Sequence, residues 1–196
     1  MTIYPMRLTA LCEIYSGVSF PKKPIAEDEG NFFVMESSAV DTLGKINPSA
    51  LKLVSNQQYK MSANYLLDKD VLLRAKGSTH SAILFKDRFD LPVVPSSYFL
   101  ILRLKEKRMC SSAFLTCLLN HSLYQKRLSE LAGGATIQHL TKKRLSSLEL
   151  IIPVPEVQSL IVRLNEEQKN EELLERKLVS LRQELYEVTT AKLLEI

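Results

Sequence analysis

The chain has 196 residues, of which 45% are apolar and 24% are charged, and its net charge is +4. This composition indicates a folded globular protein of one ordinary domain and excludes a disordered chain. No apolar run approaches the roughly 20 residues that are needed to cross a bilayer. Arg7 and Glu13 interrupt the start where a signal peptide needs a continuous apolar stretch, so we expect a cytoplasmic protein.

The charge is unevenly distributed along the chain. Residues 1–153 hold 20 Lys and Arg against 13 Asp and Glu, a net charge of +7, whereas residues 154–196 hold 6 against 9, a net charge of −3. A basic region is typical of a polyanion-binding surface, although a domain without a nucleic-acid partner can carry the same charge. The three cysteines form no CxxC pair and no zinc spacing, so we expect reduced, buried thiols.

Residues 1–153 alternate short apolar runs with turn-rich stretches at 21–30, 44–48, 76–81 and 92–97. This alternation predicts a mixed or antiparallel β domain with a few helices, of the α+β class. The expected strands are Leu8–Tyr15, Phe32–Met35, Val71–Leu73, Ala82–Phe85 and Tyr98–Leu104.

The second half of this region favours helices. A single helix is expected over residues 111–131, where apolar residues recur at a helical period before the glycine pair at 133–134. Thr141 is placed to cap a short helix. The apolar stretch at 148–152 then predicts a last strand, which Pro153 ends.

From Glu156 onward the chain contains no Gly and no Pro, and a heptad pattern places apolar residues at eight of twelve core positions. The pattern predicts a coiled-coil helix on the order of 60 Å long. We expect it to pair with another helix; folding back on its own domain is the alternative. Glu167 and Glu171 interrupt the seam and either face solvent or set the register. The expected helix-interface residues are Leu160, Leu164, Leu174, Leu178, Leu181, Leu185 and Val188.

The sequence offers little support for catalysis. The three histidines lie far apart, and the chain contains neither a nucleotide-binding glycine motif nor the Asn-Pro-Pro-aromatic tetrad of DNA amino-methyltransferases. Asp68, Asp70 and Lys76 loosely match a nuclease arrangement, but turn residues beside a strand explain them better. Ser96 and Ser97 have no nearby base in the sequence. We therefore expect no catalytic residue and no metal site.

Three polar and basic clusters are better suited to contact DNA. Cations with backbone and hydroxyl donors bind phosphates, whereas amide and imidazole groups can address base edges. Each cluster alone is also typical of a solvated surface, and for Thr136 a buried, capped turn is an equal alternative. The candidate DNA-contacting residues are Lys22, Lys23, Arg74, Lys76, Gly77, Ser78, Thr79, His80, Thr136, Gln138, His139, Lys142, Lys143 and Arg144.

The segment Gly134–Leu140 reads Gly-Ala-Thr-Ile-Gln-His-Leu, and Leu145, Leu148 and Ile152-Pro153 follow it before the long helix. This order resembles the end of a target-recognition domain in the specificity (S) subunits of type I restriction-modification systems. The Glu-Gln pair that the family has after the prolines appears here as Val157-Gln158. Looser similarity is found over residues 11–20, 67–78, 95–97 and 114–122.

The resemblance implies a DNA target-recognition domain over residues 1–153 and the family's long conserved-region helix over 154–196, used for dimerisation and subunit docking. A full S subunit carries two such domains and two such helices, so this chain resembles a half-subunit. Its two-fold homodimer would pair antiparallel helices and read a bipartite palindrome.

The implied partners are double-stranded DNA, a methyltransferase subunit and a restriction subunit. S-adenosylmethionine and ATP with Mg are implied only on those partner subunits, so the chain itself is expected to bind no cofactor. An adaptor that docks onto a methyltransferase without selective DNA binding is the alternative function. A stand-alone nuclease or methyltransferase is disfavoured because its motifs are missing.

Overall fold

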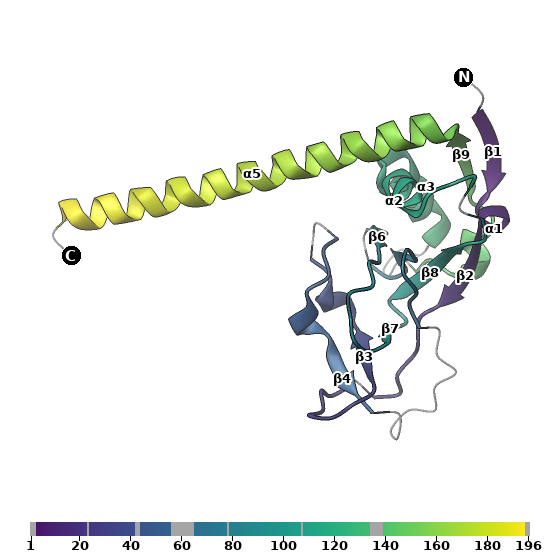
Figure 1. Cartoon of the computed structure of the whole chain (residues 1–196), viewed down its shortest axis with the longest axis horizontal. Coiled ribbons are helices and arrows are strands. Elements are labelled where there is room, and N and C mark those ends of the chain that lie inside the picture. Colours follow the sequence, from purple (N-terminus) through teal and green to yellow (C-terminus); the bar gives the residue numbers. More distant parts are fainter. Residues whose placement is uncertain are drawn as a thin grey trace. The chain divides into compact units, whose positions relative to one another are not determined.

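The structure is a computed structural model, shown in Figure 1, and describes residues 3–22, 24–41, 44–55, 65–77, 79–106, 108–133 and 139–194. It divides into two compact units, Met1–Gln158 and Ser159–Ile196. The division falls inside the long helix α5 (Pro155–Leu193), whereas the sequence places it after Pro153. The first turn of α5 thus belongs to the first unit.

Gln158 holds this first turn in place. Its side chain is 4% exposed. The Nε2 group donates to the carbonyls of Met109 and Pro153 at 2.7 and 2.9 Å, and Oε1 accepts from the Ser111 N–H at 3.2 Å. A buried amide with all these groups satisfied stabilises the junction between the last strand and the helix.

A four-stranded antiparallel sheet forms the centre of the first unit. Its strands, in spatial order, are β2 (Cys12–Ser16), β8 (Phe99–Leu104), β5 (Val71–Arg74) and β6 (Ala82–Leu84). The register aligns Val71 with Leu102. The inner strands β5 and β8 are buried on both faces along most of their length, so their sequences read as continuous apolar runs rather than as alternating ones.

Two smaller sheets contain the other strands. β3 (Phe32–Met35) lies between β4 (Lys52–Val54), to which it is antiparallel, and β7 (Val93–Pro95), to which it is parallel. β1 (Ile3–Arg7) pairs antiparallel with β9 (Glu149–Pro153), so the two ends of the first unit meet in one sheet. This mixture of mostly antiparallel sheets with helices confirms the predicted α+β class.

One apolar cluster joins the four-stranded sheet to the three-stranded sheet. Leu72 of β5 and Phe99 and Ile101 of β8 pack with Met35 of β3 and Val93 of β7, and each is 2% exposed or less. Burying a side chain of this size stabilises a fold by about 1.5–3 kcal/mol. The central strands are therefore fixed mainly by packing between sheets.

The sequence pattern misplaces several elements. The predicted strand Leu8–Tyr15 is wrong at its start, because Leu8–Leu11 form a single helical turn, α1, before β2 begins. Leu8 and Leu11 are both buried at a helical spacing of three residues, which an apolar run does not distinguish from a pleat. The stretch 92–97 contains β7 rather than only a turn. The pattern also gives no sign of β1, β4, η1 (Ser37–Ala39) or η2 (Pro48–Ala50).

Residues 111–131 form two helices rather than the single predicted one, namely α2 (Ser112–Asn120) and α3 (Ser122–Ala132). His121 separates them with an extended backbone, φ −63° and ψ 139°, and its Nδ1 accepts a hydrogen bond from the Leu123 N–H. The apolar period continues across the break, so periodicity alone does not reveal it.

The predicted helix ends in this region are confirmed. The Ser111 hydroxyl caps α2, and Gly133, with φ 57°, ends α3. Thr141 accepts a hydrogen bond from the Arg144 N–H at 3.3 Å and caps α4 (Lys142–Leu145).

Polar side chains near the helix break attach α2 to strand β6 and α3 to the segment that precedes β6. Asn120 accepts a hydrogen bond from the Ala82 N–H and donates one to the Ala82 carbonyl, both at 2.8 Å. Gln125 donates to the carbonyls of His80 and Leu119 at 2.9 and 2.7 Å. The peptide groups of Ala82 thus find their partners in a side chain.

The second unit continues α5, an uninterrupted helix of 39 residues that confirms the long helix expected after Pro153. At 1.5 Å per residue, its length is about 58 Å. Within the ranges described, no helix combines the length and the apolar character that crossing a membrane requires.

Two of the three cysteines lie in the interior of the first unit. Cys12 and Cys110 are buried and Cys117 is half-buried, and none of the three forms a disulfide. Burial raises the pKa of Cys12 from its ordinary 9.0 to about 12, with a further increase from the neighbouring Cys110. Burial raises the pKa of Cys110 to about 12 as well.

We expect Cys12 and Cys110 to resist alkylation at pH 8 in the folded protein, because only the thiolate reacts. Their labelling should be on the order of a hundredfold slower than in concentrated urea. The stability that these thiols contribute is fully present below pH 9 and is lost as the pH rises toward 12, since the folded-state pKa is the higher one. Time-resolved iodoacetamide labelling with peptide mass spectrometry checks this. Equal rates for Cys12 in folded and unfolded protein would contradict it.

Candidate nucleic-acid interface

The chain beyond strand β5 brings two of the basic clusters together. Lys76 forms an isolated antiparallel bridge with His139, and the Leu140 N–H donates to the Ala75 carbonyl at 2.8 Å. Ala75 and Leu140 are buried, whereas His139 is exposed and Lys76 is partly exposed. Burial of the apolar pair thus keeps the two polar residues on neighbouring backbone positions at the surface.

Lys76 also lies against an aromatic side chain. Its Nζ is 5.0 Å from the centre of the Tyr98 ring and 3.5 Å from the Ser97 hydroxyl oxygen. Tyr98 is 46% exposed. A cation beside an exposed aromatic ring offers one group for a phosphate and one for a base or sugar, a combination that recurs in nucleic-acid-binding surfaces. From the sequence, Tyr98 is expected as the start of a strand and not as a DNA contact, and the strand topology places it beside Lys76.

A hollow of about 460 Å³ adjoins Tyr98 and includes Lys22 in its lining. Five serines contribute to the lining, so the hollow offers hydroxyl donors beside a cation, as phosphate-contacting surfaces do. Glu36 also lines it, but that carboxylate is paired with Lys52. The lining residues are Val18, Ser19, Phe20, Lys22, Pro24, Glu36, Ser37, Ser38, Ser96, Ser97 and Tyr98.

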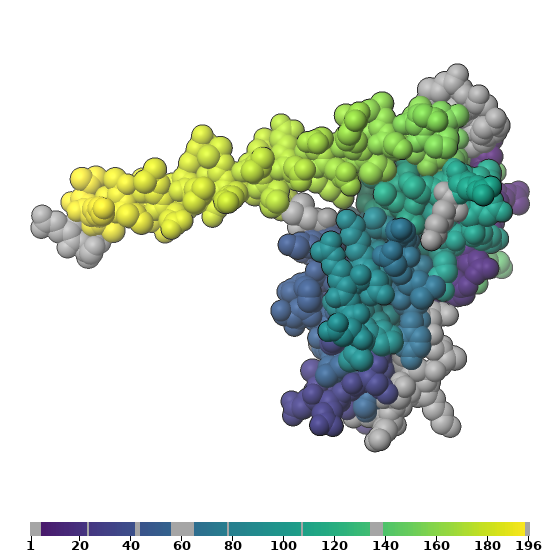
Figure 2. Space-filling view, viewed as in Figure 1, coloured from purple at the N-terminus to yellow at the C-terminus, as the bar shows by residue number. Residues whose placement is uncertain are grey.

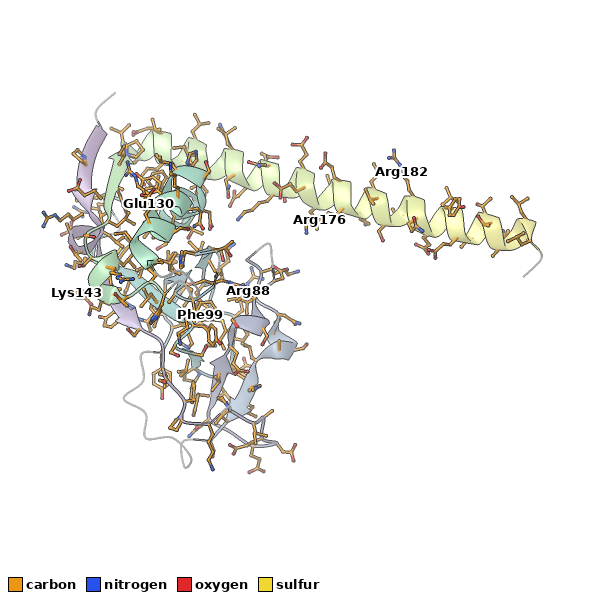
Figure 3. The ribbon with its side chains drawn as sticks, turned by 180° about the vertical axis from the view of Figure 1, so that it is seen from behind. Arg88, Phe99, Glu130, Lys143, Arg176 and Arg182 are labelled. Atoms are coloured by element: carbon orange, nitrogen blue, oxygen red, sulfur yellow. The ribbon has the colours of Figure 1, made fainter. Side chains whose placement is uncertain are left out.

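The three cations of α4 have different roles. The Arg144 guanidinium donates to the Ala132 carbonyl at the end of α3. A Cβ on Gly133 would lie 2.9 Å from that guanidinium, so the glycine leaves room for it. Lys142 and Lys143 are exposed, and the salt bridges found among the described residues do not include them. Figure 3 shows Lys143 at the margin of the first unit.

His80 and Arg74 serve the fold. His80 is fully buried, its N–H donates to Gln125 Oε1 at 3.2 Å, and its Nδ1 lies 2.9 Å from the Arg74 carbonyl oxygen. The Arg74 guanidinium donates to the Val40 carbonyl at 2.8 Å. Both side chains are used within the first unit, so we leave His80 and Arg74 out of the proposed DNA contacts.

The loop between them retains two exposed candidates. Gly77 has φ 115°, and no atom lies near the position of a Cβ there, so the glycine is required by its backbone conformation and not by crowding. Thr79 is exposed. The remaining candidates, Lys23, Ser78, Thr136 and Gln138, lie outside the described residues.

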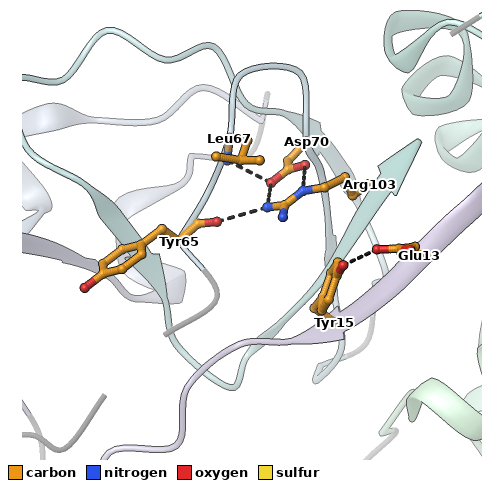
Figure 4. A network of polar contacts seen from close by, with 6 residues as sticks. All are labelled: Glu13, Tyr15, Tyr65, Leu67, Asp70 and Arg103. Atoms are coloured by element: carbon orange, nitrogen blue, oxygen red, sulfur yellow. Dashed lines mark hydrogen bonds and ion pairs between the residues drawn. The ribbon is translucent and has the colours of Figure 1, made fainter. Parts of the chain in front are cut away.

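A buried ion pair explains one of the carboxylates that loosely match a nuclease. Asp70 is 2% exposed and accepts hydrogen bonds from Arg103 Nε at 2.9 Å and Nη2 at 2.7 Å (Figure 4). It also accepts from the Leu67 N–H at 2.9 Å, and Arg103 donates to the Tyr65 carbonyl at 3.0 Å. Hydrogen bonding to Asp70 raises the pKa of Arg103. Asp70 therefore ties β5 to β8 and to the segment that precedes β5.

The other nuclease candidates are dispersed. Asp68 accepts a hydrogen bond from the Asp87 N–H, and Lys76 lies at the Tyr98 ring. In the part of the chain that the structure describes, no group of three His, Cys, Asp or Glu side chains is arranged to hold a metal ion.

A second cationic hollow lies elsewhere in the first unit, with a volume of about 470 Å³. Its lining includes Lys45, Lys86 and Arg88 together with the half-buried Ile46 and Phe89. These cations could not be recognised as a cluster from the sequence. Lys45 lies in a turn and the other two follow β6, so the three are not close together in the sequence.

The apolar seam of α5 is open to solvent in the single chain. All seven predicted helix-interface residues are exposed, from 45% at Leu160 to 67% at Leu174. Figure 2 shows α5 as a row of protruding side chains, coloured green to yellow. A row of exposed leucines at heptad spacing is what an unpaired coiled-coil helix presents.

Comparison with known proteins identifies the family. A model of the type I restriction modification DNA specificity domain matches residues 3–178. The chain belongs to this family. The match takes in the specificity domain's strands, its helices α1 to α4 and more than half of α5.

Solved structures of specificity subunits share the fold. The type I system S subunit from M. genitalium is 19% identical with a TM-score of 0.57, and the HsdS subunit from Thermoanaerobacter tengcongensis is 21% identical with a TM-score of 0.66. A structure of a type I R-M system, described for its complex assembly and conformational transition, is 20% identical with a TM-score of 0.69. No curated protein gives a significant match.

The chain spans less than half the length of these solved chains. The matches cover 90–95% of this chain but only 41–44% of the solved chains. This proportion agrees with a sequence that carries one target-recognition domain and one long helix.

Proposed function

We propose that this chain reads one half-site of double-stranded DNA for a type I restriction-modification system and performs no catalysis itself. The observation that carries the proposal is the bridge between Lys76 and His139, which joins two basic clusters that are far apart in the sequence. Tyr98 and Lys22 extend this surface, and Lys142 and Lys143 begin α4 three residues after His139.

The groups on this surface suit different parts of a duplex. Lys22, Lys142 and Lys143 are exposed cations that match the phosphate backbone. His139, with imidazole donor and acceptor positions, is suited to base edges. Backbone contacts position a protein and base contacts specify the sequence, so this surface supplies both kinds of group.

The assembly that we propose is a two-fold homodimer through the α5 seam, acting in the cytoplasm. Methyltransferase and restriction subunits would dock on the paired helices. S-adenosylmethionine and ATP with Mg would be bound by those subunits and not by this chain. Two copies would then present two reading surfaces to a bipartite, palindromic target.

We expect Lys142→Glu with Lys143→Glu to weaken duplex binding by on the order of a hundredfold and to reduce the slope of log affinity against log salt by about 2. Lys126→Glu reverses one charge at an exposed position on α3 outside the candidate DNA contacts; it is the control variant and should change affinity little. Fluorescence anisotropy with a duplex pool at several salt concentrations measures both quantities. Light scattering confirms that the oligomeric state is unchanged. If the wild-type protein binds no duplex at low salt, the proposed DNA-reading function is wrong.

A second candidate function rests on a different surface. Val179, Tyr186 and Leu193 recur every seven residues on α5 beside the seam and are 65–79% exposed. This stripe favours a further helical partner, as an adaptor without selective DNA binding would need. Binding of a methyltransferase subunit together with failure of the duplex titration would support the adaptor.

A further inference from the structure

The charged residues along α5 form a pattern that bears on how two copies pair. In the heptad frame, Glu167, Glu171 and Lys192 occupy core positions within the leucine seam. Glu175 and Arg182 lie on one flank of the seam, and Lys177 and Glu184 lie on the other. All seven side chains are exposed, and the salt bridges found among the described residues involve none of them. Flanking charges of this kind set partner choice and orientation in coiled coils.

A parallel pair conflicts with these charges. In-register parallel helices place each core residue opposite itself, so Glu167, Glu171 and Lys192 would each face a like charge. The two flanks also face each other across a parallel pair, which sets Lys177 opposite Arg182 of the second copy. Like charges in these positions are destabilising.

An antiparallel pair matches six of these seven charges with opposite charges in one register, in which Glu171 faces Val188. Here each flank faces its own counterpart, because one helix is reversed. When Leu178 faces Leu181 of the second copy, Leu174 faces Leu185, and Glu167 faces Lys192 across the seam. In this register Glu175 comes opposite Arg182 and Lys177 comes opposite Glu184, each offset along the axis by two residues, or about 3 Å. The two-fold axis repeats every one of these pairs.

Shifting one helix along the other by one heptad removes the match between opposite charges. A shift in one direction places Glu175 opposite Glu175 of the second copy and Lys177 opposite Lys177. A shift in the other direction places Arg182 opposite Arg182 and Glu184 opposite Glu184. Both neighbouring registers thus bring like charges together on both flanks.

From this pattern we infer that α5 carries a self-recognition code, in which Glu175, Lys177, Arg182 and Glu184 select an antiparallel second copy of this chain in a single register. The inference rests on the homodimer of the proposed function. It adds that partner selection is encoded in these four side chains, so another specificity chain with a different flank pattern would pair less well.

Charge-reversal variants test the code directly. Lys177→Glu and Glu184→Lys each create two like-charge pairs in the antiparallel dimer, so each should raise the dimer dissociation constant roughly tenfold. Combining both changes in one chain restores two opposite-charge pairs and should return the constant to near the wild-type value. Arg176→Glu is the matched control, since the heptad frame places Arg176 on the side of α5 away from the seam. Figure 3 shows Arg176 and Arg182 on different sides of the helix.

Mixing the two single variants gives the sharper result. A heterodimer of Lys177→Glu and Glu184→Lys chains has opposite charges at both pairs, so native mass spectrometry should show heterodimers well above the statistical half. A parallel dimer predicts the opposite for Lys177→Glu, which would then face Arg182 and bind more tightly. Tighter or unchanged dimers of that variant would overturn the register, whereas a monomeric wild-type chain would overturn the homodimer itself. Duplex binding is measured separately, so the proposed DNA-reading function is tested independently of the helix register.

Discussion

Replacing Arg103 with Met is expected to lower the free energy of unfolding by about 3–5 kcal/mol, because it leaves the Asp70 carboxylate buried without its cation. Asp70 is 2% exposed and receives two hydrogen bonds from this guanidinium. Arg103 also holds the Tyr65 carbonyl, so the segment before β5 loses a second contact. Urea unfolding followed by circular dichroism measures the change.

A double variant separates the pair from its surroundings. Asp70→Asn with Arg103→Met removes both charges and keeps an oxygen for the Leu67 N–H, so its loss of stability should be clearly smaller than the sum of the single losses. Arg103→Lys keeps the charge but not the forked geometry and should fall between wild type and Arg103→Met. A loss below about 1 kcal/mol for Arg103→Met would show that the pair is not important for stability.

Replacing Leu181 with Asp is expected to convert the proposed homodimer into monomers, with the dissociation constant raised at least about a hundredfold. Leu181 lies in the middle of the unbroken apolar part of the seam, and the two-fold axis of the proposed homodimer would place the change in the interface twice. The first unit should unfold as in the wild type, since the change lies in the second unit.

Ser180→Asp is the matched control for this prediction, because Ser180 is exposed and lies off the seam. Light scattering over a concentration series gives the mass of each variant. A Leu181→Asp chain that keeps the dimer mass would show that the α5 seam is not where the copies associate. This result would leave the DNA contacts proposed for the first unit untested and unchanged.

The periodic parts of the fold could be predicted from the sequence. The α5 heptads repeat over many turns, and the caps at Ser111 and Thr141 are local signals that depend on a few neighbouring residues. The strand at Leu8–Tyr15 could not be placed correctly, because a short apolar run fits a helical turn and a pleat equally well. The break at His121 lies beside contacts of Asn120 with β6 and of Gln125 with His80, which no local pattern encodes.

In the candidate site, too, local features could be predicted from the sequence and contacts between distant segments could not. Its cations could be found as sequence clusters, but the bridge between Lys76 and His139 depends on how distant segments pair. Tyr98 joins the site only because β8 lies beside β5. His80 has a side chain of a type that often contacts DNA, but it lies in the core. Only its burial in the structure distinguishes these two roles.

The hydrogen bonds between Asn120 and Ala82 have a consequence for how the protein behaves at high concentration. β6 is the last strand of its sheet, and an open strand edge offers unpaired peptide groups onto which a strand of another molecule can add. Here the Asn120 amide occupies both peptide groups of Ala82, so the edge is closed to such growth at that point. Strand addition to β6 is thereby opposed at Ala82, whereas the leucine row of α5 is exposed, so association with another molecule is favoured along the helix rather than at this point of the sheet.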